Sequence, residues 1–271
     1  MSKKKIIKRA YSILLLLFVS TLMKNISSGK INLDDALNQA AGIISGETDQ
    51  NKTAGQGASV VPGDYSNTGA DIYGISVPDY DGQNIAYILN NNEPFFISEY
   101  DLATTKTYVK FSDLDIYERQ GQVNAVVGPE TLADEERGDI SIYPSGWWEA
   151  KQTDANVNRC HLLAFCLAGN QTNVRENLIT GSRAMNAGAS GYNGSMLDYE
   201  LMTVRYIEDT GNHVRYRVTP VFENVDVTAK GVLMEAESIE DQGAGLKFCV
   251  WIHNVQPEYT CDYTTGVWEH N

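Results

Sequence analysis

Hydrophobic and polar residues alternate along residues 214–219, where Val214, Tyr216 and Val218 are separated by Arg215 and Arg217. A period of two is typical of a half-buried strand, so we expect the basic side chains on the face away from the core. Other short runs rich in β-branched and aromatic residues predict strands at residues 85–89, 95–97, 108–111, 147–150, 231–236 and 246–252.

The pattern changes to a helical period after residue 195. Leu197, Leu201 and Val204 recur on one face of a helix, and Ser195 with Asp198 forms a capping box at its start. This helix is expected to run up to the glycine at 211, and residues 162–168 predict a second, short helix closed by a glycine. The predicted fold class is therefore α+β, a mainly antiparallel sheet covered by the helices of residues 162–210.

The first 30 residues have the composition of an export segment. A basic cluster, Lys3 to Arg9, precedes an apolar run of 14 residues from Ala10 to Met23, which is shorter than the roughly 20 residues of a usual membrane helix. Residues 1–30 are therefore expected to be a signal peptide or an N-terminal membrane anchor, and the protein to be secreted or extracellular. Residues 31–70, rich in Gly, Asn, Asp, Ser, Thr and Ala, predict a flexible spacer before a folded domain at 71–271.

The charge of the chain is strongly acidic. The 271 residues carry a formal net charge of −14, and after residue 30 there are 14 basic against 35 acidic residues. Such a surface repels polyanions at long range, which argues against histone-like wrapping of nucleic acid and against adhesion to anionic lipid. Residues 159–217 differ, with six Arg, no Lys and five acidic residues. They are a candidate phosphate-binding floor, or alternatively these Arg pair with the acids.

Four cysteines, Cys160, Cys166, Cys249 and Cys261, would permit two disulfides in an exported chain. Cys249 and Cys261 are 12 positions apart and flank residues 255–257, a sequence typical of the end of a hairpin. This pair is the preferred bridge. The alternative is that all four cysteines are reduced.

His161 is the first candidate for chemistry among the four histidines, which stand at 161, 213, 253 and 270. It lies at a strand–loop–helix junction beside Arg159, where a rigidly held imidazole can reach solvent and act as a general base near neutral pH. A lone histidine is more often structural, so its surroundings decide the interpretation. They are residues 158–162 (NRCHL), 176–186 (ENLITGSRAMN) and 196–200 (MLDYE).

With these segments the sequence resembles the DNA/RNA non-specific endonuclease family of ββα-metal (His-Me finger) nucleases, in particular the DNA-entry nucleases and streptodornase-type DNases of Gram-positive bacteria. The similarity includes residues 136–138 (ERG), 211–222 (GNHVRYRVTPVF) and 254–257 (NVQP) and covers roughly residues 80–268. The family signature, often Asp-Arg-Gly-His, stands here as Asn158–Arg159–Cys160–His161. The resemblance implies a ββα-metal nuclease fold for the domain at 71–271.

The resemblance implies three central roles: His161 as general base, Asn186 as metal ligand and Glu200 as the helical acid near the metal's waters. A single neutral amide leaves most of the metal shell to water, which suits Mg²⁺, with Mn²⁺ as a substitute. Asn177 is the alternative ligand, but we interpret it as a residue that stabilises a loop. Glu200 could instead pair with Arg205, although a spacing of five is poor helical geometry.

Several arginines are expected to bind the substrate. Arg159 and Arg183 are candidates to hold the phosphate and to neutralise charge that grows in the transition state, which places Arg159 among the catalytic residues. Arg137 resembles an upstream phosphate-contacting arginine of the family. Arg205 is expected to bind substrate as well, and it could, like Arg215 and Arg217, line the groove or make surface pairs.

The sequence thus predicts an exported, Mg²⁺-dependent, sequence-non-specific endonuclease that hydrolyses DNA and RNA to 5′-phosphate and 3′-hydroxyl ends. The alternative is a catalytically silent exported module that holds nucleic acid in the arginine-rich groove. A pure binder would hold DNA in EDTA and leave it uncut in Mg²⁺. Membrane attachment is expected through the N-terminal segment only, and the sequence identifies no protein partner.

Overall fold

The computed structural model describes residues 71–72, 75–96 and 103–271. The predicted export segment at 1–30 and the predicted spacer at 31–70 lie outside the described residues, as does residue 97 of the strand predicted at 95–97. Within the described part of the chain, no helix has the length and the apolar character needed to cross a membrane.

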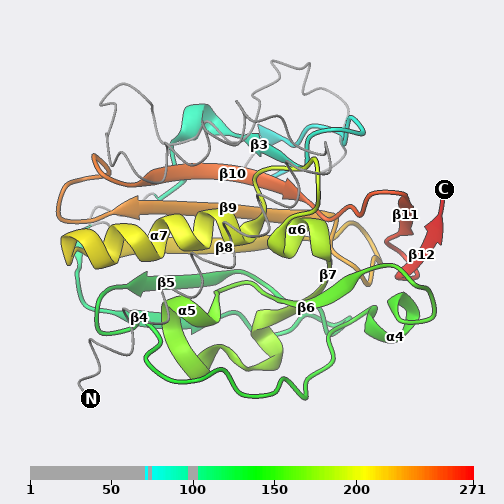
Figure 1. Cartoon of the computed structure of the whole chain (residues 1–271), viewed down its shortest axis with the longest axis horizontal. Coiled ribbons are helices and arrows are strands. Elements are labelled where there is room, and N and C mark those ends of the chain that lie inside the picture. Colours follow the sequence, from blue (N-terminus) through cyan, green and yellow to red (C-terminus); the bar gives the residue numbers. More distant parts are fainter. Residues whose placement is uncertain (1–70, 73–74, 97–102) are drawn as a thin grey trace, which may run out of the picture. The chain divides into compact units, whose positions relative to one another are not determined.

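The largest element is a six-stranded antiparallel sheet with the strand order β3-β10-β9-β8-β5-β4 (Figure 1). Its three long strands are in register along their whole lengths, with Val214 opposite Ser238 and Lys247 opposite Glu237. The strands are β3 (Ala86–Ile88), β4 (Tyr108–Phe111), β5 (Val123–Val127), β8 (Val214–Val221), β9 (Gly231–Ser238) and β10 (Lys247–His253). The predicted antiparallel sheet is therefore confirmed.

Three two-stranded sheets complete the strands. They are β1 (Asp71–Ile72) with β2 (Ile75–Ser76), β6 (Val157–His161) with β7 (Leu178–Ser182), and β11 (Tyr259–Asp262) with β12 (Val267–His270). The helices are α4 (Trp147–Ala150), α5 (Phe165–Ala168), α6 (Arg183–Ala187) and α7 (Met196–Thr210), with 3-10 turns η1 (Asn90–Asn92), η2 (Gly169–Thr172) and η3 (Arg175–Asn177).

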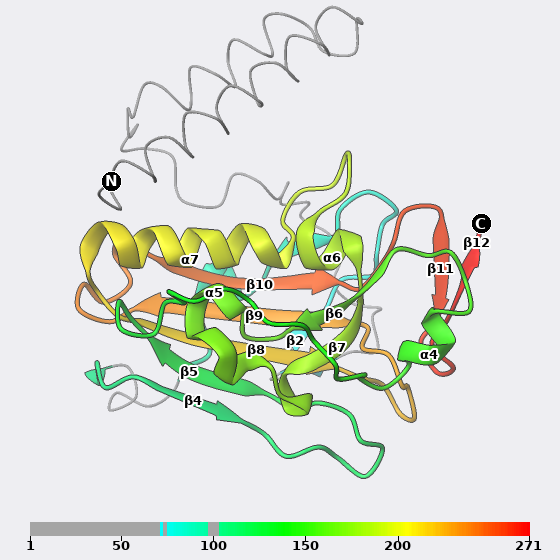
Figure 2. The ribbon, with the colours of Figure 1, turned by 60° about the horizontal axis from the view of Figure 1, so that its bottom comes forward.

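Helix α7 has the limits that its sequence predicts. The Ser195 backbone N–H donates to the Asp198 carboxylate over 2.9 Å, and Gly211 ends the helix in the left-handed conformation with φ 73°. The helix runs along the long strands of the sheet, in front of β8 and β9 in Figure 1 and next to β10 in Figure 2, on the same face of the sheet as α5 and α6. Its buried side chains join those of the sheet in one hydrophobic core, which fixes the position of every residue on the helix.

Strand β8 is buried on both faces, whereas the alternation predicts one solvated face. Tyr216 and Val218 face the core shared with α7. Arg215 and Arg217 on the other face expose only 6% and 8% of their surface, because the ring of Phe96 covers both guanidinium groups at 5.4 and 4.9 Å. The basic face of this strand is therefore an interior, not an open surface.

The hairpin of β6 and β7 followed by α6 forms a ββα unit. The turn into α6 is capped by Ser182, whose hydroxyl accepts from the Met185 backbone N–H at 3.0 Å. Gly181 permits this packing, since a Cβ there would lie 2.5 Å from both the Cys160 sulfur and the Met185 methyl group. The unit holds the predicted general base at the end of β6.

Asn254 fastens the ββα unit to the large sheet. Its fully buried amide accepts from the Ser182 backbone N–H at 2.7 Å and donates to the carbonyls of Thr180 and Ala229 at 3.1 and 2.9 Å. Gln256, two residues further on, accepts from the Ala184 backbone N–H at 3.2 Å. The Asn-Val-Gln-Pro segment thus holds β7 and the start of α6 against β9.

Two of the sequence-based element predictions are wrong, and a third, the short helix closed by Gly169, begins later than predicted. Residues 147–150 form helix α4 rather than a strand, because Gly146 turns the chain with φ 69° and Trp147 and Ala150, three residues apart, pack into the same small core. The helix predicted at 162–168 spans only Phe165–Ala168, and residues 95–96 belong to no strand.

The preferred disulfide is also wrong, because all four cysteines are free. Cys249 lies in β10 within the core on the second face of the sheet, beside Trp251. Cys261 lies in β11 and packs into the separate small core around Trp268. The spacing of the two cysteines along the chain gave no information about these different environments.

Candidate active site

His161 is the last residue of β6 and lies opposite Leu178 of β7. The next residue continues the pairing through a hydrogen bond from the Leu162 backbone N–H to the Asn177 carbonyl at 2.8 Å. The residue exposes 6% of its surface. It is thus held by a paired backbone and surrounded by protein on most sides.

Both ring nitrogens of His161 have partners. The Arg137 guanidinium lies 2.9 Å from Nδ1, and the Asn173 side-chain oxygen lies 2.9 Å from Nε2. A guanidinium can only donate, so Nδ1 must accept and carries no proton. Nε2 therefore carries the proton and donates it to the Asn173 amide. The two neighbours together select one neutral tautomer of the imidazole.

The pKa of His161 is lowered from 6.5 to about 4: burial is the largest cause, the hydrogen bond with Asn173 opposes the shift, and the positive charge of Arg137 adds to it. The imidazole is consequently neutral at physiological pH. A neutral imidazole with an unprotonated Nδ1 is the form that can accept a proton from water.

Asn173 was not singled out by the sequence. It follows Thr172 in the loop between α5 and β7, and Asn177 gives that loop its shape. The Asn177 amide is fully buried, accepts from the Leu163 backbone N–H at 2.8 Å and donates to the carbonyls of Leu163 and Thr172, each at 2.9 Å. The interpretation of Asn177 as a loop-stabilising residue is confirmed. No periodic signal could have found Asn173, because the loop has no period.

Glu200 lies on the buried face of α7, with 8% of its surface exposed. Burial raises the pKa of its carboxyl group to about 8, against the opposing charge of Arg137. Within the described residues no hydrogen bond or ion pair joins Glu200 to Arg205. Arg205 is exposed on the same helix, and five residues of α-helix place it roughly 140° around the axis from Glu200. The structure therefore does not bring these two together.

Asn186 lies near the end of α6, is half-buried and makes no side-chain hydrogen bond to any residue that the structure describes. Its amide oxygen is therefore available to a ligand. Among the described residues no group of three or more His, Cys, Asp or Glu side chains could enclose a metal ion. One amide oxygen leaves the rest of the coordination shell to water, which fits Mg²⁺, because this ion keeps several waters and prefers oxygen ligands.

The predicted phosphate-binding arginines differ in their surroundings. Arg137 and Arg183 are exposed, and both lie close enough to the Cys160 thiol to influence its pKa. Arg159 donates to the Ile140 carbonyl at 2.5 Å, and its guanidinium lies 5.3 Å from the Tyr143 ring centroid. A contact of Arg159 with phosphate stays a prediction. It would use the guanidinium N–H groups that do not donate to the Ile140 carbonyl.

Arg217 belongs to a buried ion pair, not to a groove. Its guanidinium binds the fully buried Glu235 carboxylate of β9 through two hydrogen bonds of 2.6 and 2.7 Å. The Phe95 backbone N–H donates to the same carboxylate at 2.7 Å. Arg217 is thus neither part of a phosphate-binding floor nor paired with one of the five acids of residues 159–217, because its partner, Glu235, lies outside that window.

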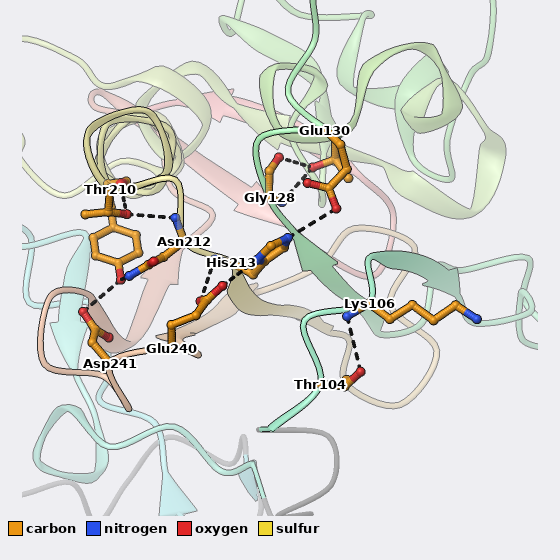
Figure 3. Close-up of polar contacts among 11 residues, drawn as sticks. Thr104, Lys106, Gly128, Glu130, Thr210, Asn212, His213, Glu240 and Asp241 are labelled. Atoms are coloured by element: carbon orange, nitrogen blue, oxygen red, sulfur yellow. Dashed lines mark hydrogen bonds and ion pairs between the residues drawn. The ribbon is translucent and has the colours of Figure 1, made fainter.

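His213 differs from His161 in that carboxylates contact both of its ring nitrogens (Figure 3). Its Nδ1 lies 2.6 Å from a Glu240 carboxylate oxygen, its Nε2 lies 3.3 Å from Glu130, and its backbone N–H also binds Glu240 at 2.8 Å. These carboxylates raise the pKa of His213. The residue links the loops that follow β5 and β9, and nothing in its surroundings prepares it as a base.

The six-stranded sheet, the ββα unit and the buried, neutral histidine at the end of β6 define a ββα-metal nuclease. A sequence model of the DNA/RNA non-specific endonuclease family matches residues 99–240, more than half of the chain. The chain belongs to this family. It is an enzyme of the non-specific endonuclease type, which confirms the predicted family and fold class and removes the catalytically silent module as an alternative.

Solved structures agree with this assignment. NucA from Streptococcus agalactiae with a magnesium ion bound is 28% identical, with a TM-score of 0.61 over 71% of this chain and 89% of that chain. Sda1 nuclease with a bound zinc ion is 24% identical, with a TM-score of 0.51 over 60% and 81%. An extracellular endonuclease is 19% identical, with a TM-score of 0.51 over 69% and 95%. The last two show the fold alone, and no curated protein matches the chain.

Proposed function

We propose that this nuclease is exported and hydrolyses the phosphodiester bonds of DNA and RNA, without sequence preference and with Mg²⁺ or, as a substitute, Mn²⁺, to 5′-phosphate and 3′-hydroxyl ends. Contacts with phosphate carry no base information, which supports the absence of sequence preference. The magnesium ion in the 28%-identical NucA supports the choice of metal. The basic and apolar segment at 1–30 supports export, either as a cleaved signal or as an anchor.

The hydrogen bonds of His161 are the observation that carries the proposal. Nδ1 has the lone pair that must take the proton of the attacking water, and Asn173 holds the ring through Nε2. Arg137 hydrogen-bonds Nδ1 in the free protein, but its guanidinium is an equally good partner for a phosphate oxygen. Substrate phosphate therefore competes for Arg137, and the departing hydrogen bond leaves Nδ1 open to water.

Asn186 would hold the metal, and Glu200 would accept hydrogen bonds from the metal's waters. When bound, Mg²⁺ supplies Lewis-acid stabilisation of the charge on the leaving 3′-oxygen. A cation near the Glu200 carboxyl group favours its ionised form, which burial alone disfavours. Arg183 at the start of α6, together with Arg137, would neutralise the charge that grows on the phosphate.

A cleavage assay on closed circular plasmid and on RNA tests the proposal. Residues 31–271 of the wild type, His161→Ala and the matched control His270→Ala would be compared with Mg²⁺ and with EDTA; His270 is exposed and lies next to the C-terminus. We expect the wild type and the control to degrade both substrates with Mg²⁺ only, and His161→Ala to bind DNA without cutting it. Equal cleavage by the wild type and His161→Ala would exclude His161 as the base.

Export needs a separate measurement. Mass spectrometry of the mature N-terminus, on protein recovered from the medium and from the membrane fraction, distinguishes a cleaved signal from a retained anchor. Protein found only in the cytoplasm with Met1 retained would contradict export.

A further inference from the structure

Two aromatic side chains stand exposed beside the strand that carries His161. Tyr143 and Trp148 expose 45% and 60% of their surface, and their ring centroids lie 4.6 Å apart at an angle of 38°. Aromatic rings of this size are usually buried, and an exposed pair in contact offers a π-surface to a ligand. The proposed mechanism uses neither residue.

The position of the pair follows from the path of residues 137–148, which run along one face of β6 in the opposite direction. Arg137 contacts His161 at one end, and the carbonyl of Ile140 accepts from Arg159 two residues back along the strand. Alternate residues of a strand share a face. Arg159 and His161 therefore lie on the same side of β6, about 7 Å apart along it, and Tyr143 of the pair contacts Arg159.

The pair is held firmly. The Arg159 guanidinium contacts two rings, 5.3 Å from the Tyr143 centroid and 5.2 Å from the Trp147 centroid, and these two rings also lie 6.4 Å from each other. Trp147 packs in turn into the small core around Trp268. Gly146, with φ 69°, lies so close to Thr228 that a Cβ would collide with its hydroxyl group. A platform that is already ordered loses little conformational entropy when a ligand binds.

We propose that Tyr143 and Trp148 form a stacking platform for unpaired bases of the substrate strand and so give the enzyme a preference for single-stranded nucleic acid. The inference rests on the proposed cleavage at His161, because it places the platform along the strand from the scissile phosphate. Every base has a π-face, so stacking adds affinity without sequence preference. Bases inside a duplex are already stacked and must be extruded first.

Steady-state kinetics on matched substrates test the platform. The KM for a single-stranded oligonucleotide would be compared with the KM for its duplex in the wild type, Trp148→Ala, Tyr143→Ala and Trp148→Phe. The control is Ile116→Ala, which removes the most exposed large apolar side chain among the described residues, 90% exposed, from the loop between β4 and β5. We expect either alanine variant to raise the ratio of single-strand to duplex KM about tenfold. Trp148→Phe should keep this ratio near the wild-type value, and Ile116→Ala should leave it unchanged.

Binding of oligonucleotides with one abasic site supplies a second readout that does not need cleavage. In the His161→Ala background, moving the abasic site along the strand should reveal a position where its loss weakens binding about tenfold. Adding Trp148→Ala should abolish that penalty. Equal KM ratios for Trp148→Ala and Ile116→Ala, or an unchanged abasic penalty, would overturn the platform. If the wild type cut neither substrate with Mg²⁺, the proposed function would fail instead, and the abasic experiment would still decide on the platform.

Discussion

His161 and His213 are prepared for opposite charge states by the same chain. His161 meets a donor-only guanidinium at one nitrogen and a neutral amide at the other, and burial together with the charge of Arg137 lowers its pKa to about 4. His213 meets the carboxylates of Glu240 and Glu130, and its pKa is raised. The difference teaches that burial and the charge of its partners together decide whether an imidazole can serve as a base at neutral pH.

Replacement of each histidine by alanine should give the widest contrast. His161→Ala should lower the rate of cleavage by about 10²- to 10⁴-fold, the usual contribution of general-base catalysis. His213→Ala should leave the rate of the folded protein within about threefold, because His213 meets only the carboxylates of two loops. Initial rates on plasmid, normalised to the folded fraction from circular dichroism, check both. A comparable loss in the two variants would break the comparison.

The buried Arg217 and the exposed Arg205 should differ in how much each contributes to the free energy of unfolding. Glu235→Gln leaves the Arg217 guanidinium buried without its counter-charge, which should lower the free energy of unfolding by about 3 kcal/mol or more. Arg205→Ala, at an exposed position of α7, should change it by less than about 0.5 kcal/mol. Urea denaturation measures both. A small effect of Glu235→Gln would show that water reaches Arg217.

Asn173 should act through His161. Asn173→Ala removes the acceptor of the Nε2 proton and should lower kcat about 10- to 100-fold, a part of the general-base contribution. Asn173→Asp retains an acceptor but adds a negative charge, which raises the pKa of His161 and should move the acid limb of the pH–rate profile to higher pH. A merely structural role for Asn173 would leave that limb in place.

The two histidines should also give opposite pH dependences of stability. The folded-state pKa of His161 is lowered from 6.5 to about 4, so the wild type loses stability as the pH falls below about 6.5, by about 1–2 kcal/mol at pH 5. The stability of His161→Gln relative to the wild type should therefore increase as the pH falls. The pKa of His213 is raised, so its contribution is present below about pH 6.5 and is lost as the pH rises through the folded-state value.

Thermal unfolding in EDTA between pH 5 and pH 8 measures both slopes. His213→Gln should lower the melting temperature most at the acid end of this range, where His161→Gln should lower it least. Slopes of the same sign would contradict the assigned charge states.

Long periodic segments of the fold could be predicted from the sequence, and short ones could not. Helix α7 and strands β8 to β10 repeat their pattern often enough to identify them, whereas the four residues of α4 owe their conformation to Gly146 and to the small core beneath Trp147. His161 could be found through its neighbours in the sequence. Asn173 could not, because its position depends on how Asn177 shapes a loop.

The arginine-rich window illustrates a second limit. Composition does not distinguish the six arginines of residues 159–217 from one another, but the fold buries Arg217 against Glu235 and exposes Arg183. The acid that binds Arg217 comes from β9, outside the window, and only the register of β8 with β9 places the two residues opposite each other. Charge counts along the chain therefore cannot separate an interior ion pair from a substrate-binding surface.

The most direct test of the account is the protonation state of the His161 ring in the intact, metal-free protein. Long-range ¹H–¹⁵N NMR spectra, with His161 assigned by its absence in His161→Gln, report which nitrogen carries a proton. We expect a neutral ring with Nε2 protonated and Nδ1 unprotonated throughout pH 5.5–8, while His213 gains a proton on both nitrogens toward the acid end. A His161 ring that is doubly protonated at pH 6, or that carries its proton on Nδ1, would contradict the assignment of Nδ1 as the catalytic base.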